Sequence, residues 1–542
     1  MPNKRKTVRK QLYWLGILLA GLILFSGCSQ AEGQKQPKQE NSSQGAAGNQ
    51  ENNGRESSIQ PERDEGQQRT EETANTEEVI WTPAPVISPT YWQDNRYTED
   101  GGLLVEGTFQ AFEVSGEGYE IVAEAIRGWF LGEEEAFVQS MNQKEEYAEE
   151  VLEDTPSFYP YYQNTKYNST RADSSIISIS CLYDEYFGGA HGLYGTWGTT
   201  FDVQTGERLS FWDLTGNREE FAKKTLEYCL ELAKKEHEDM LFESYEATIR
   251  GVWETEPNWY LDGAGITIVF TPYEIGPFAM GEAHLTLPYQ EFADLLLPEY
   301  QMGSQAGVAV LPEGVGAQIN LGQVYSGKES VKLFARPVDG ENYGLRTYVL
   351  ELGEKTEIVA QMDRLVRSYL LQREDGRSFL LFYGDMASED YVTYVYELTD
   401  GNIRKVQDGE TGAFIQSGSV NAQGFTLGIR VDALGTYTAY GDYILTEDGL
   451  VEPAGEWCTI SQGSILTTVR ELPVMVDGRE TVLPVGSRIQ LIGTDRKGVL
   501  RYQMVNSVEE GEIHFTLGEG GWPVYIDGIE ETAYFEDLPY AG

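Results

Sequence analysis

Apolar side chains recur at intervals of three to five residues in two stretches of the chain. In residues 118–141 the apolar positions are Ile121, Ala125, Ile126, Trp129, Phe130 and Phe137. In residues 219–242 they are Phe221, Leu226, Leu230 and Ala233. Because this spacing gathers the side chains on one face of an α-helix, it predicts two amphipathic helices. A shorter helix is expected over residues 292–297, where Pro298 stops it.

Strands are predicted between these helices. Residues 174–187 alternate apolar side chains, such as Ile177 and Ile179, with residues that we expect to face outward. Residues 265–271 (GITIVFT) form a short apolar run that is typical of a buried strand. Because helices and strands are mixed here, we expect an α+β domain over residues 81–303.

Residues 304–463 lack helical periodicity and have the pattern of paired strands. Residues 378–383 and 391–398 are aromatic strand candidates, and Asp400-Gly401 and Asp448-Gly449 supply hairpin turns. We expect an all-β region built as a meander. A propeller-like arrangement is the alternative, although no fixed repeat period is present.

Three acidic residues of this region, Asp385, Glu389 and Asp390, lie close together in the sequence. Calcium sites use carboxylate oxygens, but these residues lack the spacing of an EF-hand loop. A solvated acidic loop is therefore the preferred interpretation.

Residues 464–542 resemble a bacterial SH3-like β-barrel. Short strands are predicted at 466–469, 488–493 and 502–505, and a glycine-rich segment follows at 520–528. Such barrels bind peptides or wall components through aromatic grooves. Trp522, Tyr525 and Tyr534 are candidates for a groove of this kind, and placement in the core is the alternative.

The first thirty residues have the three parts of a secretion signal. A basic segment contains Lys4, Arg5, Lys6, Arg9 and Lys10. An apolar segment at 12–25 precedes Ser26-Gly27-Cys28, which resembles a bacterial lipobox. We expect a signal peptide at 1–27, a lipidated Cys28, and a location on the extracellular face of a bacterial cell membrane. An uncleaved signal anchor is the alternative, since the apolar segment is only slightly shorter than a membrane span.

Residues 28–80 contain few large apolar side chains and are rich in Gln, Glu, Asn, Ser and Gly. Such a segment cannot bury enough apolar surface to fold, so we expect a disordered tether. As a random coil it would have a root-mean-square reach of roughly 40 Å.

The chain is strongly acidic. It holds 40 Lys and Arg against 87 Asp and Glu, a formal net charge of −47. Loss of residues 1–27 removes five basic and no acidic residues, which leaves a net charge of −52. This excess excludes nucleic acid as a partner, because phosphate binding needs clustered Lys and Arg. It favours a basic partner outside the cell.

Few residues are available for metal or disulfide chemistry, since the chain has only 4 His and 4 Cys. With Cys28 assigned to the lipid, we expect Cys181, Cys229 and Cys458 to be buried free thiols. A Cys181–Cys229 disulfide is the alternative. The four histidines are scattered, and no nucleophile–base pair or metal-ligand set stands out. We therefore expect no metal, no cofactor and no catalytic residues.

Two ordered motif blocks carry a resemblance to a known family. The first block comprises Tyr186-Phe-Gly-Gly-Ala-His-Gly192, Thr200-Phe-Asp-Val-Gln-Thr-Gly206 and Trp212-Asp213-Leu214. The second comprises Trp259-Tyr-Leu261, Ile268-Val-Phe270, Pro272-Tyr-Glu-Ile275 and Leu287-Pro-Tyr289. Over about residues 85–300 the chain resembles the extracellular domain of the RsiV-type anti-sigma factors. The same domain is similar to the non-catalytic N-terminal part of some peptidoglycan deacetylases.

The small residues of these blocks have a structural interpretation. Gly188, Gly189 and Gly192 predict a turn with positive φ. The segment from Asp202 to Gly206 (DVQTG) predicts a hairpin turn.

Three other residues of the blocks, His191, Tyr273 and Glu274, are candidates for ligand binding. We expect His191 to hydrogen-bond the glycine turn, with a role as catalytic base as the alternative. A buried Tyr273 hydroxyl would need a hydrogen-bond partner, and Glu274 would contribute to a polar groove.

The resemblance implies binding, because RsiV-like receptors recognise lysozyme, a strongly basic protein. About eleven residues precede the apolar segment, too few for a sigma-binding domain, and the metal motif of the deacetylases is absent. We expect a non-catalytic surface lipoprotein whose RsiV-like domain binds a lysozyme-like protein or a peptidoglycan fragment. A structural or assembly lipoprotein and an enzyme acting on the cell wall are the alternatives.

Overall fold

The computed structural model describes residues 83–154, 158–302, 305–320, 328–336, 345–386, 390–411, 413–416, 418–460 and 463–540. The expected signal peptide, Cys28, the expected tether and Glu389 lie outside these ranges. Among the helices within them, none is both long and apolar enough to cross a membrane. Strands account for 48% and helices for 21% of the structure, so the chain is mostly β.

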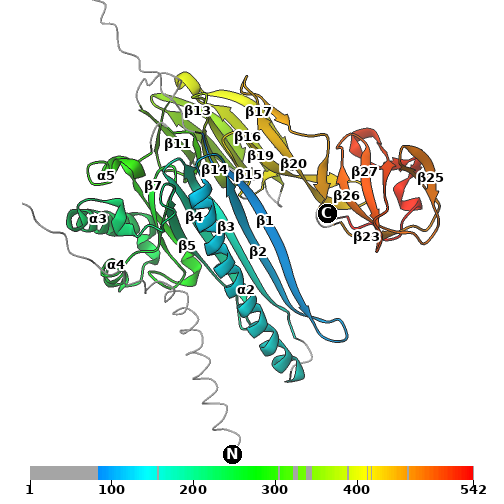
Figure 1. The fold of residues 1–542 in the computed structure, drawn as a ribbon, viewed down its shortest axis with the longest axis horizontal. Coiled ribbons are helices and arrows are strands. Elements are labelled where there is room, and N and C mark those ends of the chain that lie inside the picture. Colours follow the sequence, from blue (N-terminus) through cyan, green and yellow to red (C-terminus); the bar gives the residue numbers. More distant parts are fainter. Residues whose placement is uncertain are drawn as a thin grey trace, which may run out of the picture. The chain divides into compact units, whose positions relative to one another are not determined.

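A ten-stranded sheet runs from residue 86 to residue 411 (Figure 1). Its order is β1-β2-β3-β9-β14-β15-β16-β17, and β4 and β5 continue from β3. The strands are β1 (Val86–Tyr97), β2 (Leu103–Ser115), β3 (Tyr161–Asp173), β4 (Ile176–Tyr186), β5 (Leu193–Asp202), β9 (Gly307–Val310), β14 (Arg364–Gln372), β15 (Ser378–Asp385), β16 (Tyr391–Glu397) and β17 (Arg404–Thr411). Since β9 pairs with both β3 and β14, the sheet includes strands from both sides of residue 303.

One edge of β3 is shared by two partners. Strand β2 pairs with its first half, from Tyr161 to Lys166, and β9 pairs with its end, from Arg171 to Asp173. Strand β4 occupies the other edge along nearly the whole length of β3. The short strand β9 therefore links the α+β part of the chain to the strands that follow it.

Helix α2 (Glu120–Asp154) packs on β2, as Figure 1 shows. It includes the predicted helix and extends beyond its expected end at residue 141. Its buried side chains are Val122, Ile126, Phe130, Phe137, Met141, Lys144 and Ala148. The predicted buried face was wrong at Ile121, which is 59% exposed because Val122, one position further along the helix, faces the core instead.

Strand β4 confirms the strand predicted at 174–187, but its alternation was misjudged. Ser178 and Ser180 are buried along with their apolar neighbours. The Ser178 hydroxyl accepts a hydrogen bond of 2.8 Å from the backbone N–H of Leu261. A second sheet of β6 (Trp259–Leu261), β7 (Gly265–Phe270) and β8 (Ala283–Pro288) thus covers the face that was expected to be exposed. Strand β7 is the buried strand predicted at 265–271.

Helix α3 (Arg218–His237) confirms the second predicted helix. It buries Phe221, Thr225, Cys229 and Ala233 against the second sheet, and a 3-10 turn at Glu238–Met240 follows it. Helix α4 (Tyr245–Trp253) comes next in the chain.

The helix predicted at 292–297 was wrong in position. Helix α5 (Tyr289–Phe292) is a single turn that ends where the predicted helix begins. Beyond it, Leu296 forms a β-bridge with Thr215, and the Leu297 N–H donates to the Leu214 carbonyl. The N–H groups of Leu295 and Leu296 still donate to the Phe292 carbonyl, but at Leu297 the long-range bond ends the helical pattern.

The strands after residue 303 form successive antiparallel meanders, which confirms the all-β expectation. A separate four-stranded sheet contains β10 (Ala317–Asn320), β11 (Lys328–Arg336), β12 (Arg346–Leu352) and β13 (Lys355–Met362). Strands β14 to β17 follow as neighbours in the ten-stranded sheet. The next strands are β18 (Ala413–Ile415), β19 (Gly424–Asp432), β20 (Thr436–Leu445) and β21 (Val451–Pro453). Both predicted Asp-Gly turns are present, with Gly401 and Gly449 at φ of 66° and 70°.

The C-terminal region is all β, but its described strands do not close into a barrel. Its strands are β22 (Cys458–Ile460), β23 (Ile465–Thr467), β24 (Leu472–Val476), β25 (Arg479–Leu483), β26 (Arg488–Thr494), β27 (Val499–Met504), β28 (Glu510–His514), β29 (Thr516–Leu517), β30 (Val524–Ile526) and β31 (Ile529–Glu530). They extend the sheet of β18–β20 in the order β22-β26-β27-β28-β24-β25, and β29–β31 form a small sheet of their own.

Cys181, Cys229 and Cys458 are buried and are not joined by disulfides, as expected. The alternative disulfide does not form, because Cys181 and Cys229 lie in different apolar clusters. Burial raises the pKa of both thiols above the ordinary cysteine value, which keeps them protonated.

Candidate functional site

The first segment of the first motif block, residues 186–192, forms the loop between β4 and β5. Gly188 and Gly189 have positive φ values of 83° and 104°, as predicted, and the Tyr186 hydroxyl donates to the Gly189 carbonyl. The prediction was wrong for Gly192, which has no positive φ. A Cβ atom there would lie 2.6 Å from the Glu185 carbonyl oxygen, so close approach of the backbone explains this glycine.

Four aromatic side chains meet on the surface beside this loop, two from the motif blocks and two from neighbouring positions. We name His191, Tyr194, Tyr273 and Phe278 the aromatic patch. The His191 ring stacks on Phe278 with centroids 4.3 Å apart, and its Nε2 lies 3.4 Å from the Tyr273 hydroxyl. The ring centroids of Tyr194 and Tyr273 lie 5.5 and 5.7 Å from the ring centroid of Phe278. The structure thus brings together two of the three candidates that the sequence selected in these blocks.

Tyr273 is the most unusual residue of the patch. Its φ of 75° lies in the left-handed region, where a bulky side chain is strained, and the side chain is 52% exposed. The conformation holds an exposed tyrosine ring beside His191. Strain at an exposed aromatic residue is typical of a binding surface rather than of a core.

His191 has the structural contact that we expected. Its Nδ1 lies 2.7 Å from the Gly192 carbonyl, so the ring is fixed to the glycine turn.

Glu274 has a local role. Its carboxylate accepts hydrogen bonds from the N–H and the hydroxyl of Thr271, which closes the turn after β7. Partial desolvation and the nearby Glu282 raise its pKa above the ordinary value. The segment from Asp202 to Gly206 likewise forms the predicted turn, in which Asp202 accepts from the Thr205 N–H.

The three aromatic candidates of the C-terminal region do not share a groove. Tyr534 is 2% exposed and donates to the Ile526 carbonyl, so it belongs to the core. Trp522 is 47% exposed and lies edge-on to Tyr540, with centroids 5.0 Å apart. Tyr525 lies half-buried on β30.

A cleft that sequence reasoning missed lies between α3, β6–β8 and the loop that follows β9. We name it the α3–β8 cleft, and its volume is about 390 Å³. Tyr260 and His284 line it from the sheet, Tyr228, Lys235 and Glu236 from α3, and Glu313 from the loop. This volume falls within the range of small-molecule sites in proteins.

His284 is held in the cleft by a chain of hydrogen bonds. Its Nε2 lies 3.1 Å from Glu282, whose carboxylate also accepts from the Thr196 hydroxyl at 2.9 Å. Its Nδ1 lies 3.2 Å from the Tyr260 hydroxyl. The Glu-x-His spacing on β8 is visible in the sequence, but its meaning depends on Tyr260 and Thr196, which only the fold brings near. Burial raises the pKa of Tyr260 well above its ordinary value, so this hydroxyl is not an activated nucleophile.

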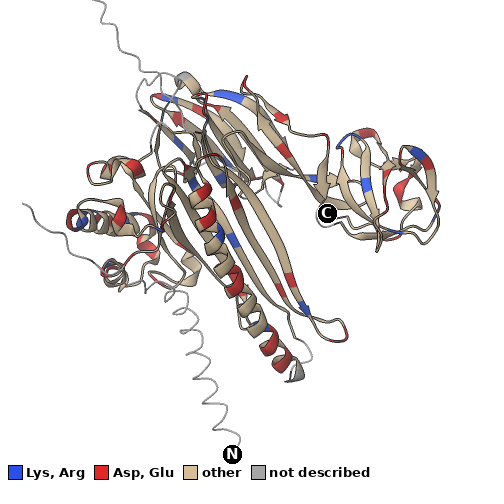
Figure 2. Ribbon diagram, viewed as in Figure 1, with Lys and Arg blue, Asp and Glu red and all other residues tan. Residues whose placement is uncertain are grey.

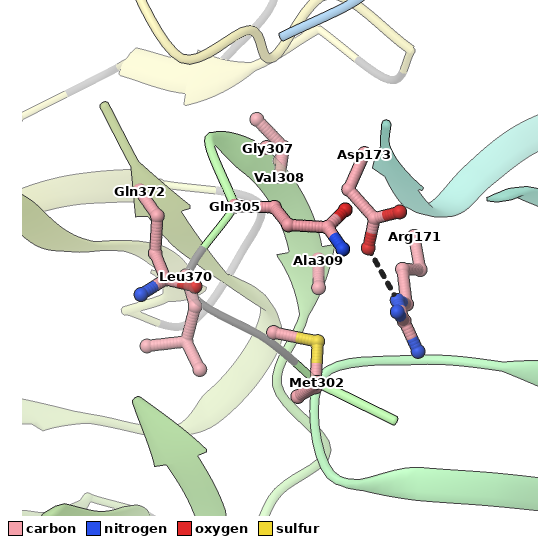
Figure 3. Close-up of a pocket in the computed structure, with 9 residues that line it drawn as sticks. All are labelled: Arg171, Asp173, Met302, Gln305, Gly307, Val308, Ala309, Leu370 and Gln372. Atoms are coloured by element: carbon pink, nitrogen blue, oxygen red, sulfur yellow. Dashed lines mark hydrogen bonds and ion pairs between the residues drawn. The ribbon is translucent and has the colours of Figure 1, made fainter. Parts of the chain in front are cut away.

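A second cavity is far smaller, at about 10 Å³, and lies beside the buried ion pair of Arg171 and Asp173 (Figure 3). Such a volume holds about one water molecule. The Arg171 Nε lies 2.7 Å from Asp173, and its Nη1 donates to the Tyr289 hydroxyl at 2.9 Å. The Tyr289 hydroxyl in turn donates to the carbonyl of Asp262. We name Arg171, Asp173, Asp262 and Tyr289 the buried polar network.

Acidic side chains are frequent in the described part of the chain. Figure 2 shows Asp and Glu repeated along α2, in keeping with the acidic sequence. Within the described ranges, no group of three or more His, Cys, Asp or Glu side chains is arranged to hold a metal ion. Asp385, which the sequence offered as a calcium ligand, lies on β15, and its carboxylate pairs with Nη2 of Arg364 at 3.4 Å.

Two family models match parts of the chain. The one described as deacetylase PdaC matches residues 113–194, and the one described as a protein of unknown function (DUF3298) matches residues 215–290. Both matches fall within the region whose motifs resemble the RsiV-like domain, and they are consistent with an extracellular domain of that type. His191 comes from the first matched segment, and Tyr273 and Phe278 come from the second.

Solved structures give distant similarities. A DUF3298-family protein from Bacteroides fragilis is 17% identical, with 40% of this chain and 96% of that one covered and a TM-score of 0.32. A DUF3298-family protein from Pseudomonas aeruginosa is 16% identical, with 41% of this chain and 98% of that one covered and a TM-score of 0.28. TolB from Acinetobacter baumannii is 12% identical, with 67% of this chain and 81% of that one covered and a TM-score of 0.16. No curated protein matches the chain.

Proposed function

We propose that this chain is a non-catalytic lipoprotein of the bacterial cell surface that binds an extracellular partner through the aromatic patch. The observation that carries the proposal is the meeting of His191, Tyr273 and Phe278 on an exposed surface. His191 is more than eighty positions away from Tyr273 and Phe278 in the sequence. Clusters of exposed aromatic side chains dominate the binding energy of many protein interfaces.

The partner that fits best is a basic protein of the lysozyme type. The chain has a net charge of −47, and Glu274 lies exposed beside the patch. An acidic surface accelerates encounter with a basic partner, and the aromatic side chains then supply contact area. A peptidoglycan fragment is the second candidate, because tyrosine and histidine rings also bind sugars.

Binding of a basic lysozyme to the full-length chain, measured by calorimetry at low and physiological salt, tests the proposal. Tyr273→Gly removes a patch ring without imposing new strain, since glycine adopts a φ of 75° readily. We expect at least a tenfold loss of affinity, as for a hot-spot residue. Tyr97→Ala is the matched control, because Tyr97 is similarly exposed, at 55%, and lies on β1.

Equal affinity of the Tyr273→Gly variant and the unchanged chain would contradict a role for the patch. If lysozyme does not bind even at low salt, the lysozyme version is wrong. Sedimentation with purified peptidoglycan, using the same two variants, then tests the second candidate.

The proposed location rests on Cys28, which is outside the described residues. We expect Cys28→Ala to release the chain from the membrane fraction, because a diacyl group would be the membrane attachment. Retention in the membrane would instead favour the uncleaved anchor.

A further inference from the structure

The α3–β8 cleft is separate from the aromatic patch and shares none of its residues. Helix α3 lines it with Tyr228, Lys235 and Glu236, and the loop after β9 lines it with Glu313. Glu313 follows β9 and lies outside both family-matched segments. The cleft is therefore assembled jointly by the DUF3298-like segment and the strand-rich region that follows it.

Hydrogen-bond acceptors outnumber donors in this cleft. Glu236 on α3 and Glu313 on the loop contribute carboxylates, and partial desolvation raises the pKa of both above the ordinary value. The positive charges of Lys235 near Glu236 and Arg346 near Glu313 oppose this rise, as does a hydrogen bond from the Ala335 N–H to Glu313. Among the described residues that line the cleft, Lys235 alone has a permanent positive charge. Both carboxylates are exposed, so a ligand with O–H and N–H donors can reach them, whereas an anionic ligand would be repelled.

Tyr260 and His284 form a hydrogen-bonded pair in the cleft. Glu282 lies 3.1 Å from Nε2 of His284, and the Tyr260 hydroxyl lies 3.2 Å from Nδ1. Thr267, which also lines the cleft, is a second hydrogen-bond partner of the Tyr260 hydroxyl. Because Tyr260 is only half-buried and His284 is exposed, a ligand in the cleft can reach both side chains.

Aromatic rings provide the apolar part of the site. Tyr228 lies half-buried on α3 and His284 is exposed on β8, and both line the cleft. Rings of this kind pack against the C–H faces of sugar rings and attract ammonium groups. Carboxylates, a phenol oxygen and aromatic faces in a volume of about 390 Å³ are suited to a short sugar chain.

We propose that the α3–β8 cleft binds a short glycan with free amino groups, in which the ammonium lies between Glu236 and Glu313 and the hydroxyls meet Tyr260. This site is independent of the partner bound by the aromatic patch.

Calorimetric titration of the full-length chain with glucosamine oligomers tests this site. N-acetylglucosamine oligomers of equal length serve as the ligand control, because acetylation removes the ammonium charge and keeps the ring. We expect Glu236→Gln and Glu313→Gln each to weaken binding about tenfold, since each removes a charge-assisted contact. Glu227→Gln on the same helix is the matched control, because Glu227 is exposed and does not line the cleft.

Equal affinity for the two kinds of oligomer, or affinity unchanged in both cleft variants, would overturn the proposal. Equally tight binding of a lysine-rich peptide would overturn it as well, because the site would then recognise ammonium groups alone. Tyr273→Gly is expected to leave glucosamine binding unchanged, and the cleft variants are expected to leave lysozyme binding unchanged. Failure of one site is thereby distinguished from failure of the other.

Discussion

The buried polar network and the aromatic patch both draw on the second motif block, yet their physical properties are opposite. In the network, Arg171 is almost wholly buried, and it donates hydrogen bonds to Asp173, to the Tyr289 hydroxyl and to the Tyr300 carbonyl. In the patch, Tyr273 is half exposed and its backbone is strained. Motif residues of the first kind maintain the fold, and those of the second kind are available to a partner.

The largest expected effect comes from breaking the ion pair in the network. Asp173→Ala leaves the Arg171 guanidinium buried without its carboxylate, which typically costs about 3–5 kcal/mol of unfolding free energy. Burial opposes the charge of Arg171, and in the unchanged protein Asp173 and Tyr289 raise its pKa. In the variant the guanidinium still keeps its proton, because arginine is not deprotonated in proteins. Urea denaturation measures the loss.

The control for this experiment is Glu246→Ala, which removes an exposed ion pair with Arg250 on α4. Exposed pairs contribute at most about 1 kcal/mol. A similar loss of unfolding free energy in both variants would show that the buried ion pair contributes no more to stability than the exposed ion pair.

An intermediate effect is expected from Asp262, and its sign depends on pH. Burial raises the pKa of Asp262 from 3.8 to about 6, against hydrogen bonds from Thr267, Ala264 and Gly265 that lower it. Between these values the folded state holds a proton that the unfolded state has released. The contribution of Asp262 to stability is therefore present below about pH 4 and is lost as the pH rises to about 6.

Asp262→Asn removes this titration and keeps the shape of the side chain. We expect the stability of the variant, relative to the unchanged chain, to rise by about 1–3 kcal/mol between pH 4 and pH 6. Asp239→Asn, at an exposed position after α3, is expected to show no such change. Urea denaturation across this pH range measures the difference, and a flat difference for Asp262→Asn would contradict the assignment.

The smallest effect on stability is expected in the aromatic patch. Tyr273→Gly removes left-handed strain and one ring contact, so the unfolding free energy should change by no more than about 1 kcal/mol. Binding should nevertheless fall sharply. A loss of stability as large as that of Asp173→Ala would place Tyr273 among the residues that maintain the fold.

The sequence predicted those parts of the fold that depend on local patterns. The periodicity of α2 and α3, the apolar run of β7 and the two Asp-Gly turns are properties of neighbouring residues. Ser178 was misjudged because its burial depends on Leu261, more than eighty positions away. The helix predicted after Phe292 was wrong because Thr215 and Leu214 bond to that segment from a distant part of the chain.

The candidate sites also contain some residues that the sequence could select and others that only the fold brings together. Motif resemblance selected His191 and Tyr273, and the fold places them together. No pattern selected Phe278, which joins them, because a single phenylalanine in a loop carries no local signal. Glu236 and Glu313 were hidden among 87 acidic residues, and only the folding of α3 beside the loop after β9 sets them in one cleft.

The shared edge of β3 has a consequence for aggregation. Residues Arg171 to Asp173 pair with β9, which is more than a hundred residues further along the chain. Without β9, the end of β3 is an open strand edge that can pair with another chain. Docking of β9 therefore protects the protein against edge-to-edge association.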